Sequence, residues 1–194
     1  EILAIKKEVE ALTGIQDKTF FFHSAMPGKI PEGVSISVNL TVYLPPSLAV
    51  KAKSEDGDVV AEGIENSLAL SSQDGDIIVN ACRGPVIAGT EDGDIVLTEI
   101  LQNAEAKSQD GDVVVTKCQG TVLAITEDGD IVLTEIQQNA EAKTQDGDVV
   151  VTKCQGTVLA IADDGDIVLT EIQQNAEAKA QDGDITVTQC QGTV

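Results

Sequence analysis

Apolar and polar residues alternate in short runs along most of this chain, and the runs recur every 18 residues. In residues 130–134, Ile131 and Leu133 are predicted to point inward and Val132 and Thr134 outward, because successive side chains of a strand point to opposite faces. A bend is then expected to bring Ile136 inward. Each unit therefore begins with a half-buried strand that carries large apolar residues on its inner face.

The second strand of each unit is predicted to bury smaller residues, such as Ala140, Ala142 and Thr144. Large residues on one wall and small residues on the other fill a narrow interior. A fixed period of this length is typical of solenoid proteins, in which each unit stacks on its neighbours. We therefore expect an all-β, parallel β-solenoid whose thin core is built one rung at a time.

The tripeptide Asp-Gly-Asp opens each of the eight units and leads into its first strand. We expect its Gly to adopt a positive φ in a turn, and its Asp side chains to accept backbone N–H hydrogen bonds. Two kinds of unit alternate, so the full pattern repeats every 36 residues. The glycines of the tripeptide are Gly57, Gly75, Gly93, Gly111, Gly129, Gly147, Gly165 and Gly183.

The coil could contain 18 or 36 residues, and the residue before each tripeptide favours 18. Acid and amide alternate there, as in Glu127 and Gln145. With 18-residue coils stacked about 4.8 Å apart, each carboxylate lies between two amides, whereas a 36-residue coil would stack the acids directly. The four cysteines recur every 36 residues and then lie about 9.6 Å apart, too far for disulfides. We predict buried free thiols at Cys82, Cys118, Cys154 and Cys190.

The N-terminal region, residues 1–46, has a different pattern from the rungs of residues 47–194. Apolar residues at helical spacing predict an amphipathic helix over residues 1–13, which Gly14 would end. This helix could cap the body or dock onto a partner. Residues 19–33 are expected to be irregular, with a local cluster of Phe20, Phe21 and Phe22. Clean alternation predicts a strand over residues 34–44, ended by two prolines.

Residues 37–64, SVNLTVYLPPSLAVKAKSEDGDVVAEGI, contain an alternating strand, a proline stop and an apolar strand that leads into Gly-Asp-Val. This run and the Gly-Asp-Ile rungs after it resemble the bacterial adhesin-like β-solenoid domains, a family of largely unassigned function. The resemblance extends over about residues 34–194. It implies a right-handed parallel β-solenoid at a cell surface or outside the cell, and it supplies no catalytic residues.

Composition limits the partners that such a chain can have. The chain is 42% apolar and 2% aromatic, and 12 basic against 33 acidic residues give a net charge of −21. Nucleic acids and anionic membranes are poor partners for such a surface. No apolar run approaches the roughly 20 residues needed to cross a bilayer. We therefore expect a soluble chain with no membrane insertion, for which cations and basic surfaces are better partners.

The acidic tripeptides suggest calcium, because stacked turns present columns of hard oxygen ligands and calcium takes six to eight of them. The glycine-rich nonapeptide of calcium β-rolls is absent from the sequence, and structural Asp turns are the alternative. We expect no obligatory cofactor, with calcium as an alternative. Its candidate ligands are Asp92, Asp94, Asp110, Asp112, Asp128, Asp130, Asp146 and Asp148.

Outward apolar residues on the second strands suggest a contact surface, since they lie on alternate rungs between charged rungs. They could be covered by the N-terminal segment or form a lateral contact. They are Ile87, Leu123, Ile125, Leu159 and Ile161.

The C-terminal rung, with Val187 and Val194, is predicted to expose an unpaired edge and an open core. In a longer chain further residues would cover it. Otherwise the strand at residues 34–44 or the Phe cluster of another copy would cover it, in a head-to-tail contact that can propagate.

Enzymatic activity is not expected, because no nucleophile is paired with a base and no phosphate loop is present. The leading hypothesis is a structural or adhesive β-solenoid of the cell surface that self-associates into filaments. One alternative is a module that binds calcium or a glycan, and surface glycans or proteins are further candidate partners. The second alternative is an intracellular scaffold.

Overall fold

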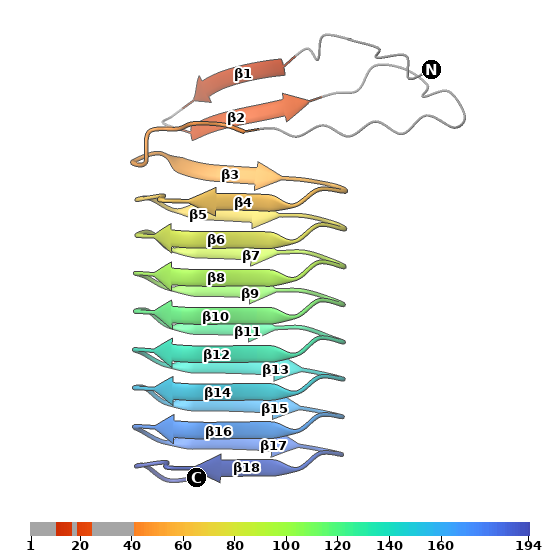
Figure 1. Ribbon diagram of the computed structural model, residues 1–194, viewed down its shortest axis with the longest axis vertical. Coiled ribbons are helices and arrows are strands. Elements are labelled where there is room, and N and C mark those ends of the chain that lie inside the picture. The colour runs from red at the N-terminus through yellow and green to blue at the C-terminus, as the bar shows by residue number, and fades with distance from the viewer. Residues whose placement is uncertain (1–10, 17–18, 25–40) are drawn as a thin grey trace, which may run out of the picture.

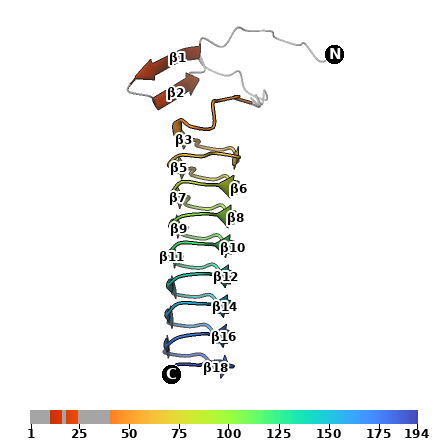
Figure 2. The ribbon, with the colours of Figure 1, turned by 90° about the vertical axis from the view of Figure 1, so that its left-hand side faces the viewer.

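The computed structural model describes residues 11–16, 19–24 and 41–194, and within these ranges every regular element is a β-strand. The chain winds into a parallel β-solenoid of about eight right-handed turns, stacked along one axis (Figures 1 and 2). Each turn contributes one strand to each of two sheets, and the sheets face each other across a narrow interior. The fold class predicted from the hydrophobic pattern is confirmed.

The ten-stranded sheet contains the second strand of each rung and, at its N-terminal end, an antiparallel hairpin. Strand β2 pairs with β1 in the antiparallel sense and with β3 in the parallel sense. The order is β1 (Ala11–Gln16), β2 (Thr19–Ser24), β3 (Ala49–Lys53), β5 (Leu68–Ser71), β7 (Val86–Gly89), β9 (Ala104–Lys107), β11 (Val122–Ile125), β13 (Ala140–Thr144), β15 (Val158–Ala162) and β17 (Ala176–Ala180).

The eight-stranded sheet contains the strands that follow the Asp-Gly-Asp turns, and all of its pairings are parallel. Its order is β18 (Ile185–Thr188), β16 (Ile167–Ile172), β14 (Val149–Cys154), β12 (Ile131–Ile136), β10 (Val113–Cys118), β8 (Ile95–Ile100), β6 (Ile77–Cys82) and β4 (Val59–Glu62).

The register of both sheets confirms the 18-residue coil. Val113 pairs with Ile131 in the eight-stranded sheet, and Leu123 pairs with Glu141 in the ten-stranded sheet. Each residue therefore lies beside its own counterpart in the next rung, and side chains of one position form a column along the axis.

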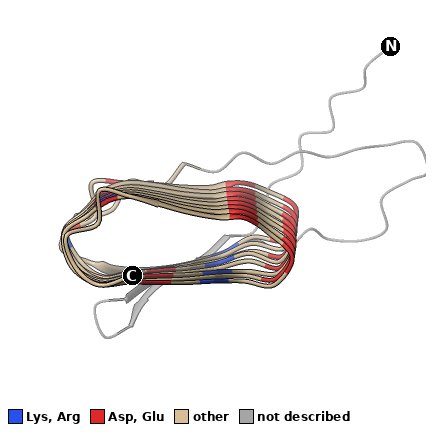
Figure 3. Ribbon diagram, turned by 90° about the horizontal axis from the view of Figure 1, so that it is seen from below, with Lys and Arg blue, Asp and Glu red and all other residues tan. Residues whose placement is uncertain are grey.

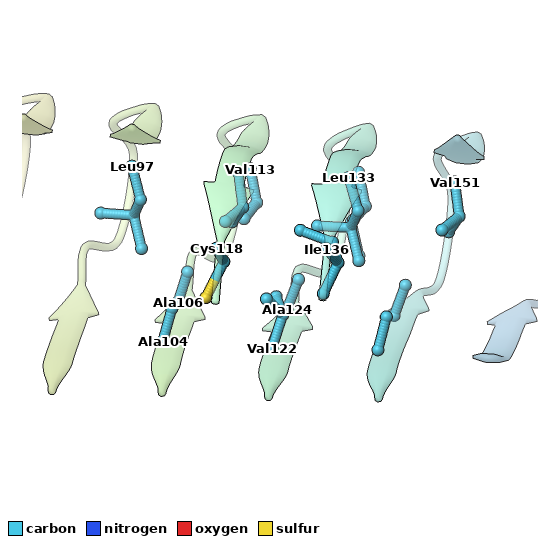
Figure 4. Packing of buried hydrophobic residues seen from close by; sticks show 14 of the residues in the cluster. Leu97, Ala104, Ala106, Val113, Cys118, Val122, Ala124, Leu133, Ile136 and Val151 are labelled. Atoms are coloured by element: carbon cyan, nitrogen blue, oxygen red, sulfur yellow. The ribbon is translucent and has the colours of Figure 1, made fainter. Parts of the chain in front are cut away.

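The core consists of the inward residues of both sheets, as the alternation predicts (Figure 4). Leu133 and Ile136 of β12 are fully buried, and so is Ala142 of β13. Large side chains of the eight-stranded sheet thus face mostly Ala and Val of the ten-stranded sheet. The small residues allow the two walls to approach closely without leaving a void.

The expected positive φ at the Asp-Gly-Asp glycines is wrong. Positive φ occurs instead at the bend near the end of each strand of the eight-stranded sheet, where Lys117 has φ 58° and Glu135 has φ 59°. This residue turns the backbone so that Leu133 and Ile136 both point inward. The bend series begins at Gly63 and continues with Ala81, Glu99, Lys117, Glu135, Lys153, Glu171 and Gln189.

The glycines of the tripeptide are required by close stacking. A Cβ at Gly129 would lie 2.2 Å from the carbonyl oxygen of Gly111 and 3.0 Å from the backbone nitrogen of Asp112. The Thr126 hydroxyl fills the inside of this corner, because it donates to the Gly111 carbonyl at 3.0 Å and accepts from the Gly129 N–H at 3.3 Å. The backbones of successive turns are thus too close for any side chain at this position.

Three expectations for the N-terminal region need correction or lie outside the described residues. Residues 11–13, expected in a helix, belong to β1, and residues 1–10 are not described. Residues 20–22, expected to be irregular, belong to β2. Residues 41–44 lie outside any strand, whereas residues 34–40 of that predicted strand are not described. In residues 11–13, backbone hydrogen bonds of the β1–β2 hairpin determine the structure, rather than the helical spacing of apolar residues.

We predict that Gly129→Val destabilises the protein much more than Gln137→Val. The first substitution forces the backbones of two rungs apart, and overpacking of this kind costs about 1–3 kcal/mol or more. Gln137 is exposed and tolerates the same side chain. Thermal unfolding followed by circular dichroism compares the two variants, and equal melting temperatures would contradict the close stacking.

Candidate functional site

The acidic edge is the narrow side of the solenoid that contains the Asp-Gly-Asp turns (Figure 3). The second Asp of each turn forms an inner column whose carboxylates link successive rungs. Asp112 Oδ1 accepts the backbone N–H of Asp130 at 2.8 Å, and Asp130 Oδ1 accepts that of Asp148 at 2.8 Å. The same contact joins each turn to the next from Asp58 to Asp184, at 2.8–3.1 Å. The expected structural role of these aspartates is therefore confirmed.

The first Asp of each turn forms an outer column, whose members are exposed like most of the inner column. Asp92, Asp110, Asp128 and Asp146 belong to this column, whereas the other four calcium candidates belong to the inner one. Within the described ranges, no group of three or more Asp, Glu, His or Cys residues is arranged to hold a metal ion. The edge therefore presents a periodic line of negative charge rather than a closed coordination shell.

The cysteines are free, as predicted, and three of them are buried. Burial raises the pKa of Cys82, Cys118 and Cys154, although a backbone hydrogen bond to each sulfur acts in the opposite direction. A raised pKa keeps a thiol protonated and unreactive. Cys190, in the last rung, is half-buried. These residues act as small core side chains that alternate with Ile.

The outer face of the ten-stranded sheet carries the apolar residues that the sequence singled out. Leu123, Ile125, Leu159 and Ile161 are half-buried rather than exposed, and Ile87 is 54% exposed. Strand β2 continues the sheet beside β3, so the described part of the N-terminal region does not cover these four residues. Within the described residues, this face is therefore available for a lateral contact.

The outer face of the eight-stranded sheet was not singled out by sequence reasoning. Its half-buried outward positions form a Val column and a Thr column: Val96, Val114, Val132, Val150 and Val168, beside Thr98, Thr116, Thr134, Thr152 and Thr170. The repeated Val-x-Thr triplet is the signal that could have identified it.

Beside these columns, a groove of about 890 Å³ runs along the bend. Charges alternate along it, and Lys117 pairs with Glu99 at 3.1 Å and Lys153 with Glu135 at 3.6 Å. The groove is lined by Glu99, Leu101, Lys117, Gln119, Glu135, Gln137, Lys153, Gln155, Glu171 and Gln173.

At its two ends, the eight-stranded sheet has outer strands with one partner each within the described chain. Strand β18 pairs only with β16, and β4 pairs only with β6. Val187 of β18 is half-buried, whereas Val194 is 75% exposed. Phe20, Phe21 and Phe22 lie in β2, in the other sheet, and Phe20 pairs with Val50.

Comparisons with known proteins support the fold. The family model described as Toastrack DUF4097, a β-solenoid-like domain of unassigned function, matches residues 47–131. No curated protein and no solved structure matches the chain. The described residues contain no helix that is long and apolar enough to span a membrane. The match supports the β-solenoid part of the resemblance, and it does not address adhesion.

We predict that Asp130→Asn and Asp130→Ala have opposite effects in calcium-free buffer. Asn keeps an Oδ1 acceptor for the N–H of Asp148 and removes repulsion from Asp112 and Asp148, so it should stabilise by up to about 1 kcal/mol. Ala also removes the acceptor and should destabilise by about 1 kcal/mol. Chemical denaturation measures both values.

Equal losses of stability in the two variants would contradict the hydrogen-bonding role of the column. The same variants test calcium. If calcium stabilises the parent protein but not the Asn variant, the inner column holds the ion.

Proposed function

We propose that this chain is a non-enzymatic structural module of the cell surface that associates with other copies of itself. The observation that carries the proposal is the repetition of the surface. Each outward position forms a column in which the same kind of residue recurs at every rung or at every second rung, so the molecule presents periodic lines of charged, amide and apolar groups. Such surfaces suit extended contacts with a partner of similar length.

The absence of an enzymatic role is part of this proposal. A catalytic site needs a few groups with distinct environments brought together at one place. In the described chain the acidic groups are repeated rung after rung, and three of the four thiols are buried with raised pKa values. The Toastrack β-solenoid is not a known enzyme fold.

Axial self-association is the form of contact that the sheet ends support. In the parallel register of the sheet, β18 of one copy would pair with β4 of the next, and Val187 would stack above Ala61. The β1–β2 hairpin would have to move away from β3, because β17 of the first copy would take the edge of β3 that β2 occupies. The inward residues Val59 and Ala61 of β4 are half-buried, and Ile185 of β18 is 44% exposed. Unpaired strand edges with apolar residues favour the addition of another strand. Because this contact is head-to-tail, it propagates into a filament unless the rotation closes a ring.

A calcium-binding or glycan-binding module is the alternative. The exposed outer Asp column favours calcium, because its carboxylates lie about 4.8 Å apart along the edge. The groove along the bend favours a glycan or a protein, because its Gln, Glu and Lys side chains offer hydrogen bonds at every rung. The third candidate, an intracellular scaffold, would use the same surfaces in another compartment.

We predict that Val187→Lys abolishes axial assembly and leaves the inner rungs folded. The substitution places a charge in the last core layer, where the next copy would have to bury it. Thr188→Lys is the matched control, because Thr188 is exposed on the other face of the same strand. Light scattering measures assembly, and circular dichroism checks the fold. A parent protein that stays monomeric at high concentration, with and without calcium, would contradict the filament.

A further inference from the structure

The outer face of the ten-stranded sheet alternates between charged and apolar rungs. Each of β9, β13 and β17 presents one Glu and one Lys, and each of β11 and β15 presents one Leu and one Ile. Register places these residues in two columns: Glu105, Leu123, Glu141, Leu159 and Glu177 in one, and Lys107, Ile125, Lys143, Ile161 and Lys179 in the other. We call this ten-residue surface the alternating face.

From this arrangement we infer that the alternating face binds the same face of a second copy, with the two solenoid axes parallel. The rotation that relates the copies is a two-fold axis parallel to the solenoid. It exchanges the two columns and leaves each rung opposite the same rung of the other copy. Glu141 then lies opposite Lys143 of the second copy, and Leu123 lies opposite Ile125 of the second copy. Each charged rung therefore pairs Glu with Lys across the contact, and each apolar rung pairs Leu with Ile.

The residues that flank the alternating face are also compatible with this rotation. Asn139 lies opposite Gln145 of the second copy, and Thr121 lies opposite Glu127 of the second copy. Each pair combines hydrogen-bond donors and acceptors, and no pair combines two like charges. The acidic edges of the two copies lie on opposite sides of the dimer, which keeps the largest concentrations of negative charge apart.

An antiparallel arrangement of the two solenoids gives neither complementary residues across the contact nor separated acidic edges. It leaves each column opposite itself, so Glu141 meets Glu141 or, after a shift of one rung, meets Leu. It also places the two acidic edges side by side. Like charges held in contact oppose association, and the pattern therefore selects the parallel pair.

The charged residues of the alternating face are already paired within each strand. The ammonium of Lys107 lies 2.6 Å from a carboxylate oxygen of Glu105, and Lys143 makes the equivalent contact with Glu141 at 2.5 Å. These side chains are 37–51% exposed, so the pairs are accessible to a second copy. In the dimer each charged rung becomes a square of two Glu and two Lys.

The size of the alternating face indicates a weak dimer. Five rungs about 4.8 Å apart, each about five residues wide, bury roughly 800 Å² in total, below the roughly 1,200 Å² of a standard interface. The hairpin β1–β2 lies at the opposite end of the solenoid from β17 (Figure 1). The lateral contact through the alternating face uses a different surface from the axial contact between β18 and β4. An experiment can therefore disprove one of the two contacts and leave the other unaffected.

A charge-swap experiment tests the inference. One variant carries Glu105→Lys, Glu141→Lys and Glu177→Lys, and the other carries Lys107→Glu, Lys143→Glu and Lys179→Glu. Alone, each presents one sign of charge and should stay monomeric at about 0.5 mM in 0.15 M salt. Mixed, they should form a heterodimer at least about tenfold tighter than the parent dimer, because neither variant retains competing pairs within its strands. Sedimentation velocity and native mass spectrometry identify the species.

The control is the same experiment on the opposite face. Lysines in one variant and glutamates in the other replace Thr98, Thr134 and Thr170, which lie on alternate rungs like the swapped residues, and mixing these two variants should give no gain over the parent dimer. A swapped mixture that stays monomeric would overturn the inference. A control mixture that associates equally well, or a parent protein that is monomeric at about 0.5 mM, would also overturn it.

Discussion

The in-register stacking of 18-residue coils is the constraint on which the rest of the structure depends. Backbone hydrogen bonds join each rung to the next, as in the contact from the Val113 N–H to the Asp130 carbonyl at 2.9 Å. Every side chain is therefore held about 4.8 Å from its counterparts above and below. A residue is tolerated only if it can lie next to its own equivalents, whether as a core side chain, a turn or a surface charge.

In-register stacking would place like charges next to each other in neighbouring rungs, where they repel. The alternation of two kinds of unit, which gives the 36-residue pattern, reduces this repulsion. Glu135 at the bend lies between Lys117 and Lys153, and Glu127 lies between two amides. Like charges in these columns are thereby moved two rungs apart, about 9.6 Å, which is close to the screening length at physiological salt. The Asp-Gly-Asp columns are the exception. Their inner carboxylates accept backbone N–H groups, and this bonding explains why an unbroken line of Asp is compatible with the fold.

Hydrophobic periodicity predicted the fold because inward and outward positions follow directly from alternation. Leu133 and Ile136 were placed correctly, and so was the alternation of Ile with buried Cys. The role of Gly129 was not predictable from the sequence. A recurring Gly is expected both where φ is positive and where the backbones of two rungs approach closely, and the sequence does not separate these two causes. Glu135 gave no signal of its left-handed conformation, since Glu is an ordinary residue elsewhere. The spacing of apolar residues in 1–13 predicted a helix, but residues 11–13 belong to β1, which pairs with β2. The function could not be predicted in the same way, because a repeated pattern of surface residues is equally compatible with a binding face and with a face exposed to solvent.

Deletion of whole and partial coils tests the central claim most directly. Removing residues 127–144 deletes one coil, removing residues 126–161 deletes two, and removing residues 127–135 deletes half of one. If the 18-residue coil is the structural unit, the first two proteins retain a single cooperative thermal transition under reducing conditions. The one-coil deletion should be slightly less stable, because it places Lys117 next to Lys153. The half-coil deletion should lose cooperative unfolding. A one-coil deletion that fails to fold while the two-coil deletion folds would contradict this account and make 36 residues the unit.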